Sequence, residues 1–146
     1  MLISTDLVHY GGDFDHAPFG EDADGYREAV ARDRGLIREH LVGPVEPERL
    51  RELLSERVQP SDVTRHRIPW SGRFSVPFGL ETVRVLTERL GLGRPRGTLL
   101  RYGTSVSEPE LAVSDATRNA GLGYTASSNF HHWVGYGAVG YTLPAE

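Results

Sequence analysis

Cysteine is absent from this chain, which excludes disulfides, zinc–thiolate centres and thiol nucleophiles. Lysine is absent as well, and all 16 basic residues are arginine, which we attribute to the codon bias of a GC-rich genome. No apolar run approaches the roughly 18 residues of a membrane span, and no signal peptide precedes the first apolar segment. The expected location is therefore the cytoplasm, without a membrane partner.

Charge of one sign is not concentrated anywhere in the chain. The net charge is −4, and neither acidic nor basic residues form a block. Proteins that bind nucleic acid usually carry a strongly basic patch, so nucleic acid is not an expected partner.

The elements that the sequence predicts fit one domain. A chain of 146 residues, of which 38% are hydrophobic and 25% charged, can bury roughly 70% of its unfolded surface. Strands are expected over residues 1–5, 98–106 and 133–143, and helices over residues 23–41, 46–58 and 79–93. We therefore expect a single domain over residues 1–146 of the α/β class, with helices packed on a small mixed sheet.

Local signals delimit these helices. Gly43-Pro44 ends the first helix, Pro47 lies near the first turn of the second, and Gly91 or Gly93 ends the third. The segments 59–79 and 107–132 are expected to be irregular, with one helical turn near Leu111.

The stretch "STDLVHYGG", residues 4–12, places polar side chains directly after the first predicted strand. Asp6, His9 and Tyr10 are expected in the loop that leaves the strand. Polar groups at strand ends are where α/β sheets usually carry out chemistry. These residues are therefore candidates for a catalytic site, and the alternative is an Asp that caps a turn beside a His bound to a backbone carbonyl.

Three stretches occur in the order "ISTDLVHYG", "SGRFSVPFGLETVRVL" and "LLRYGTSVSEPE…VGYGAVGYTL". The first resembles an Ile-Ser-Ser-Asp-Leu-x-His-Tyr/Trp-Gly segment, and the second is similar to Cys-Gly-Arg-His-Pro-x-Gly followed by a helix. These two patterns are segments of the Memo family, also called AmmeMemoRadiSam system protein B. The third stretch resembles the terminal strand pair of the same family. That family shares its fold with the class III extradiol ring-cleaving dioxygenases.

The resemblance implies a role for two residues. Asp6 and His9 occupy the family's Asp and His positions, and the matching His in the dioxygenases is an acid/base beside the substrate. Histidine suits this role because its ordinary pKa is near 6.5. Asp6 is implied to fix the imidazole tautomer or to help bind the metal. Ser71 stands where Memo has Cys, and Phe74 where Memo has His.

The resemblance covers nearly all of this chain but only the C-terminal part of the family. The absent N-terminal half supplies two metal-binding histidines, and a serine hydroxyl is a poor ligand for a transition metal. Iron or copper is therefore expected only at a site shared with a partner chain, and none on this chain alone. The expected partner is a protein that carries the missing half, or a second copy of the chain.

Further residues are candidates for binding a small-molecule substrate beside Asp6 and His9. Ser71 and Arg73 are expected to hold an anionic substrate, since Arg73 presents a fork of donors suited to a carboxylate, although an Arg that bridges loop and helix is an equal alternative. Tyr10 belongs to the first motif, while Tyr102 and Ser105 lie at a strand end, where a packed Tyr with a satisfied hydroxyl is the alternative.

Three other histidines are weaker candidates. His131 and His132 are adjacent, and neighbouring side chains on extended chain point in different directions, so they are not expected to bind one metal together. His16 lies in the loop after the first motif and is expected to be solvated.

Two functions remain open at this point. The first is a subunit of a split Memo/extradiol-dioxygenase-like, metal-dependent oxidoreductase that acts with O₂ on a small aromatic or amino-acid-derived substrate, with His9 as acid/base. The second is a non-catalytic Memo-like scaffold or regulatory binding protein.

Overall fold

Two long antiparallel strands form the centre of the sheet. In the computed structural model, which describes residues 1–124 and 128–144, β5 (Arg96–Thr104) pairs with β6 (Trp133–Thr142) along its length. The short strands β1 (His9–Tyr10) and β2 (Gly43–Pro44) extend the sheet to the order β1-β6-β5-β2. Every pairing in this sheet is antiparallel.

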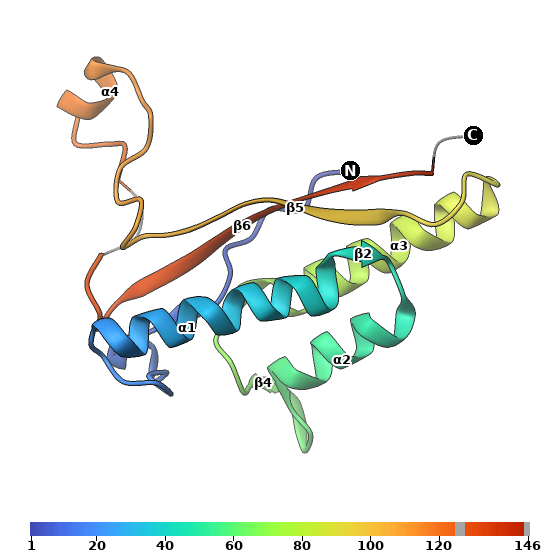
Figure 1. The fold of residues 1–146 in the computed structure, drawn as a ribbon, viewed down its shortest axis with the longest axis horizontal. Coiled ribbons are helices and arrows are strands. Elements are labelled where there is room, and N and C mark those ends of the chain that lie inside the picture. The colour runs from blue at the N-terminus through green and yellow to red at the C-terminus, as the bar shows by residue number, and fades with distance from the viewer. Residues whose placement is uncertain (125–127, 145–146) are drawn as a thin grey trace.

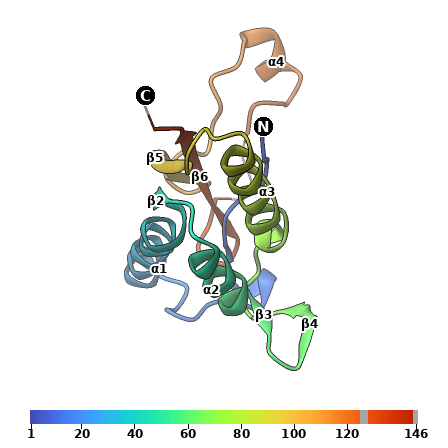
Figure 2. The ribbon, with the colours of Figure 1, turned by 90° about the vertical axis from the view of Figure 1, so that its right-hand side faces the viewer.

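Three helices lie beside this sheet (Figures 1 and 2). They are α1 (Ala23–Leu36), α2 (Pro47–Arg57) and α3 (Ser75–Arg89). Apolar side chains of α2, of α3 and of the helical turn that follows α1 (residues 37–41) meet those of β5 and β6 in one core cluster, whose buried members are Ile37, Leu41, Val45, Leu50, Leu53, Trp70, Val76 and Leu80. The α/β class, with helices packed on a small sheet, is thus confirmed, but the expected mixed sheet is wrong because all of its strand pairs are antiparallel.

The first predicted helix is confirmed over residues 23–41. The Asp22 side chain caps its start by accepting hydrogen bonds from the backbone N–H groups of Asp24 and Gly25, at 3.1 and 2.8 Å. The helix continues from α1 into a π-helical turn, η2 (Ile37–Leu41), and ends before Gly43, whose φ of +90° leaves the helical region.

The second and third helices are also present. Pro47 occupies the first turn of α2, where no backbone donor is lost. Helix α3 begins at Ser75, before the expected Gly79, because a short 3₁₀ turn, η3 (Ser71–Arg73), leads into it and Pro77 is tolerated in a first turn. Gly91, with φ +70°, follows its end.

Some expected elements differ from those observed. Residues 1–5 form no strand, and Met1 and Leu2 are exposed. Pairing begins further along, where Leu7 N donates to Gly135 O at 2.8 Å and β1 aligns with β6. The expectation of a loop at His9 and Tyr10 was therefore wrong, because these residues pair with a strand distant in sequence.

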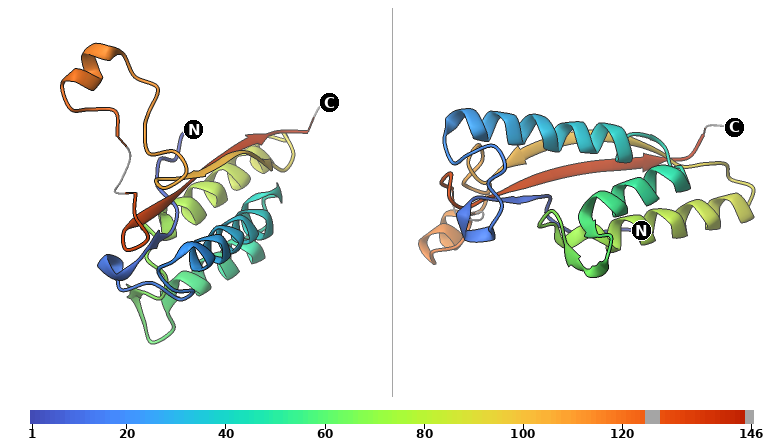
Figure 3. Two further views of the ribbon diagram at one scale, coloured as in Figure 1. Left: turned by 60° about the vertical axis from the view of Figure 1, so that its left-hand side comes forward. Right: turned by 90° about the horizontal axis from the view of Figure 1, so that it is seen from below.

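Two segments expected to be irregular contain short elements. The segment after α2 forms a two-stranded hairpin, β3 (Val58–Gln59) and β4 (Asp62–His66). The connection between β5 and β6 carries a short helix, α4 (Asp115–Asn119), which Ser114 caps, so the predicted turn near Leu111 was misplaced. This connection extends away from the helices (Figures 1 and 3).

A second core cluster lies at the β1 end of the sheet. Val8, Tyr10, Ala29 and Trp133 are its buried members. The rings of Tyr10 and Trp133 stack with their centroids 4.3 Å apart, and Tyr26 of α1 meets Trp133 edge-on at 5.0 Å. This cluster holds β1, α1 and β6 together. None of the helices in the described ranges has the length and apolar character needed to cross a membrane.

A substitution at Gly97 of β5 tests the close approach between the sheet and the end of the first helix. A Cβ at this position would lie 2.0 Å from the Leu41 carbonyl oxygen, which belongs to the backbone. We expect Gly97→Ala to lower the free energy of unfolding by about 1–3 kcal/mol or more, measured by urea denaturation. Gly35→Ala is the matched control: no atom lies within 4 Å, so this helical site should gain about 0.5–1 kcal/mol. Equal effects at the two positions would contradict the packing described.

Candidate functional site

Asp6 is the centre of a cluster that joins two distant parts of the chain. Its Oδ2 lies 2.7 Å from Nε2 of His9, and its Oδ1 accepts a short hydrogen bond from the Ser71 hydroxyl. The Thr5 hydroxyl lies 3.0 Å from the Ser71 hydroxyl. Both oxygens of the Asp6 carboxylate are therefore engaged by side chains.

Backbone contacts align the two segments that carry this cluster. The Trp70 indole N–H donates to the Asp6 carbonyl oxygen at 2.7 Å. The His9 backbone N–H donates to the Pro69 carbonyl oxygen at 2.9 Å. Because His9 opens β1 and Ser71 opens η3, the cluster is held between a strand end and a helical turn.

The hydrogen bond to Asp6 sets the tautomer of His9. An ionised carboxylate only accepts, so the proton resides on Nε2 and the lone pair resides on Nδ1. Throughout residues 1–124 and 128–144, no hydrogen-bond partner approaches this Nδ1. The ring packs edge-on against Phe14, with centroids 4.8 Å apart, and its side chain is 23% exposed. The arrangement thus orients a partly exposed histidine with one free basic nitrogen.

This order of groups does not activate Ser71 as a nucleophile. In a nucleophilic triad the serine hydroxyl bonds to the imidazole, which removes its proton. Here Asp6 stands between Ser71 and His9, and the hydroxyl donates to the carboxylate. The cluster can orient an acid/base, and Ser71 helps to hold Asp6.

Arg73 lies near this cluster and is held by its neighbours. One guanidinium nitrogen donates to the Trp70 carbonyl oxygen at 3.4 Å, and the guanidinium lies over the Phe74 ring at 4.9 Å. Its Nε is buried and has no partner among the described residues. Arg73 thus bridges η3 and the start of α3.

Tyr10, Tyr102 and Ser105 lie away from the Asp6 cluster, in the interior. The hydroxyls of Tyr10 and Tyr102 donate to the two oxygens of Asp33, at 2.9 and 3.0 Å. Ser105 is fully buried, and its hydroxyl accepts the backbone N–H of Val134 at 3.1 Å. The structure therefore brings together Asp6, His9 and Ser71 but not these three residues.

Asp33 is a buried charge that sequence reasoning missed. Burial raises the pKa of its carboxyl to about 6, while the hydrogen bonds from Tyr10 and Tyr102 act against the rise. Burial, together with the Asp33 charge, raises the pKa of both tyrosines. Asp33 sits on the apolar face of α1, and only its position on that face could have signalled its burial.

A cavity of about 260 Å³ lies between the N-terminal segment, α3 and β6. Thr5 and Trp70, which both contact the Asp6 cluster, also line this cavity, whereas His9 does not. Most of its other lining is apolar, from Ile3, Leu7, Ile37, Leu41, Val76, Leu80, Val83, Val139 and Tyr141. Such a lining favours an apolar or aromatic ligand.

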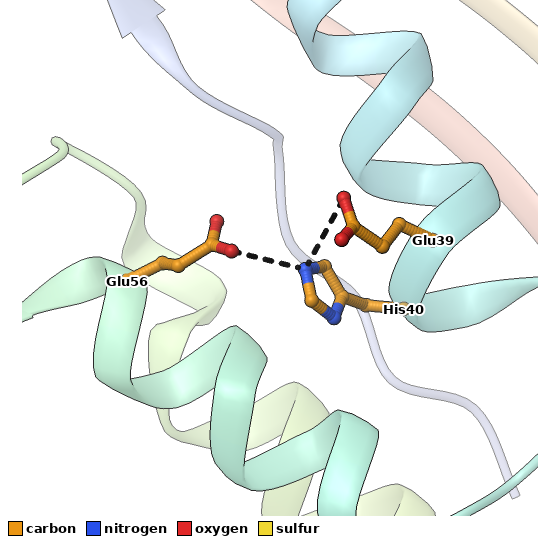
Figure 4. A group of neighbouring side chains, drawn as sticks. All are labelled: Glu39, His40 and Glu56. Carbon is orange, nitrogen blue, oxygen red and sulfur yellow. Dashed lines mark ion pairs between the residues drawn. The ribbon is translucent and has the colours of Figure 1, made fainter.

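The residues around Asp6 do not fit a metal centre on this chain alone. Asp6 and His9 are bonded to each other, and Ser71 is a poor third ligand. Within the described part of the chain, the one group of three metal-binding side chains lies elsewhere, at Glu39, His40 and Glu56 (Figure 4). Sequence reasoning missed this group because it joins two helices whose pairing the sequence does not show.

The remaining histidines bind separate partners. His131 Nδ1 lies 2.9 Å from a Glu21 carboxylate oxygen, and His132 Nδ1 lies 3.0 Å from one of Asp13. The two neighbouring rings thus contact different carboxylates. His16 packs its ring against Tyr10, and burial lowers its pKa.

Comparison with known proteins identifies no relative of this chain. No protein-family model matches this chain, and no curated protein or solved structure matches it significantly. The resemblance to the Memo family therefore rests on the three sequence stretches.

The buried Asp33 carboxyl predicts a pH dependence of stability. Its pKa of about 6 in the fold exceeds its ordinary value of 3.8, so the folded state binds more protons between these pH values. The free energy of unfolding should therefore fall as pH rises through this window, by about 3 kcal/mol from this group. Asp33→Asn lacks the titrating group, so its stability relative to the unmodified chain should rise by that amount from pH 4 to pH 7.

Urea denaturation at each pH measures this difference. Asp62→Asn is the control: hydrogen bonds from Thr64 lower the pKa of that exposed carboxyl below 3.8, so its effect on stability has the opposite sign and occurs below pH 4, and the difference should stay nearly constant across pH 4–7. A constant difference between the Asp33→Asn variant and the unmodified chain across pH 4–7 would count against a raised pKa.

Proposed function

We propose that the Asp6–His9–Ser71 cluster is the acid/base part of a Memo/extradiol-dioxygenase-like, metal-dependent oxidoreductase, which this chain forms with a partner in the cytoplasm. The proposed substrate is a small aromatic or amino-acid-derived molecule, with O₂ as oxidant. The observation that carries the proposal is the 2.7 Å contact between Asp6 and His9, which leaves Nδ1 of His9 as a free base.

The chemistry of this chain is then limited to proton transfer. Nδ1 of His9 accepts a proton from the substrate and returns it, while the Asp6 carboxylate stabilises the imidazolium. The Ser71 hydroxyl donates to the Asp6 carboxylate and the Trp70 indole N–H donates to the Asp6 carbonyl oxygen, and both hydrogen bonds keep Asp6 in place. The apolar cavity lined by Thr5 and Trp70 does not include His9, so it gives no support for the substrate class.

The partner would supply the iron or copper, because the side chains around Asp6 do not make a metal centre. An exposed apolar stripe on α3 supports such an assembly: Phe74, Phe78, Leu86 and Leu90 recur at multiples of four residues and are exposed. Met1 and Leu2, close in space to α3 at Gly79, add exposed apolar surface. Exposed large apolar side chains of this kind are candidates for an interaction surface.

The second candidate is a non-catalytic Memo-like scaffold or binding protein. It is favoured by the same missing ligands, since a chain without a metal centre can keep the fold and its partner surface. The two candidates differ in whether His9 matters to turnover.

His9→Gln tests the acid/base role. In the assembly purified from the source organism, we expect O₂ uptake with a panel of dihydroxybenzenes and aromatic amino acids to fall by roughly 10²–10⁴-fold. Asp6→Asn should cost less, because the ring remains and only its orientation is weakened. His66→Gln, at an exposed site on β4, is the control and should keep full uptake. Unchanged turnover in the His9 variant, or an assembly without O₂ uptake, would favour the scaffold.

Phe78→Glu tests the proposed partner surface. The Phe78 side chain is 77% exposed on α3, and a carboxylate there would be desolvated by any chain that covers the stripe. Light scattering after size exclusion should show the unmodified chain in a homo-oligomer or a heteromer, and the variant as a monomer. Val63→Glu, an exposed apolar site on β4, should leave the assembly intact. A monodisperse monomer before any substitution would rule out this surface as an obligate interface.

A further inference from the structure

We propose that Glu39, His40 and Glu56 form a binding site for one divalent transition-metal ion of the zinc type. The site lies where the end of the first helix meets α2 (Figure 4) and shares no residue with the Asp6 cluster. It is independent of the proposed acid/base role of His9. It departs from the expectation that this chain alone holds no metal.

The tautomer of His40 is the first step. Its Nδ1 lies 3.2 Å from the Arg49 carbonyl oxygen, and a carbonyl can only accept a hydrogen bond. The proton of the neutral ring is therefore on Nδ1, and Nε2 carries a lone pair. A backbone carbonyl bound to one ring nitrogen is the usual support for a histidine that binds metal through the other.

The surroundings of Nε2 are the second step. The His40 side chain is 1% exposed, and its Nε2 is buried without a hydrogen-bond partner among the described residues. Two carboxylate oxygens face it: Glu56 Oε1 at 3.4 Å and Glu39 Oε2 at 3.9 Å. A lone pair facing two carboxylates is unfavourable, and a cation bound between the three groups would relieve this repulsion.

The distance between His40 Nε2 and Glu56 Oε1 is compatible with a metal ion bound between them. A proton shared in an ion pair draws nitrogen and oxygen to about 2.7–2.9 Å. A tetrahedral metal ion with bonds near 2.1 Å instead holds two ligand atoms about 3.4 Å apart. The 3.4 Å between His40 Nε2 and Glu56 Oε1 matches the metal geometry. The three ligand atoms all lie within 4.8 Å of one another, and the exposed Glu39 is free to close the remaining gap.

The neighbouring arginines hold the site and also limit its affinity. Arg32 and Arg57 donate to Oε2 of Glu56, at 3.1 and 3.2 Å, which leaves Oε1 for the ion. Arg49 binds the carbonyl oxygens of Arg38, Glu39 and Pro44 and so fixes the helix end. Because two guanidinium groups lie on Glu56, we expect weaker binding than at a four-ligand structural zinc site, with a fourth position open to water.

Titration calorimetry of the tag-free chain with zinc chloride, after treatment with a chelator and its removal, tests the proposal. We expect one zinc per chain. His40→Gln should abolish this binding, and Glu39→Gln should raise the Kd by at least about tenfold. Glu39 is exposed, so its variant stays folded even if the buried His40 variant does not. The control is His131→Gln, which removes an exposed histidine that also faces a glutamate, and it should bind zinc normally.

Three outcomes overturn the site. They are the absence of zinc uptake, equal affinity in the chain with Glu39→Gln, and loss of binding in the control with His131→Gln. A thermal shift on adding zinc to the unmodified chain, reduced in the Glu39 variant, supports the site.

Discussion

The arrangement of α1 on the sheet depends on the hydrogen bonds to the buried carboxylate of Asp33. It lies on α1 and receives hydrogen bonds from Tyr10 of β1 and Tyr102 of β5. Gly135 of β6 leaves room for it, since a Cβ there would lie 2.4 Å from an Asp33 oxygen. Four elements therefore meet at one charged group, and a buried carboxylate without these donors would be strongly unfavourable. The position of β1, and with it the position of His9, follows from this contact.

Local patterns predicted the elements that local sequence determines. The helices over 23–41 and 46–58 and the two long strands are observed close to their expected bounds, because their apolar periodicity, caps and glycines act within a few residues. Residues 1–5 were misassigned for the opposite reason. Their apolar character suits a strand, but pairing depends on β6, which offers its partners only to residues 7–10.

The candidate site shows the same division. Asp6 and His9 are three residues apart, and the sequence indicated that they belong together. Ser71 was placed beside them only through a family resemblance, and the structure brings it onto Asp6. Tyr10 and Tyr102 were misplaced because their hydroxyls serve Asp33, a residue whose burial depends on how α1 packs on the sheet. Glu39, His40 and Glu56 likewise come together only through the packing of two helices.

In both His9 and His40 one ring nitrogen is held by a fixed acceptor and the other is left available, but the nitrogens are exchanged between the two residues. In His9 the carboxylate of Asp6 binds Nε2 and leaves Nδ1 available, whereas in His40 a backbone carbonyl binds Nδ1 and leaves Nε2 available. The first ring is partly exposed and faces no second charge, which suits proton transfer. The second is buried between carboxylates, which suits a cation. One fixed partner thus gives each ring a different chemistry.

The long connection between β5 and β6 has a consequence for the order in which the chain folds. Thr104 and Gly135 are the β5–β6 partners next to that connection, and they can pair only after the ends of the connection have come together. Strand β1 also pairs with β6, so it cannot pair before β6 is present. Helices and the β3–β4 hairpin form from neighbouring residues and need no such closure. Because β6 follows Asp6 and His9 by more than 100 residues in the chain, these two residues acquire their final geometry only after β6 has been synthesised.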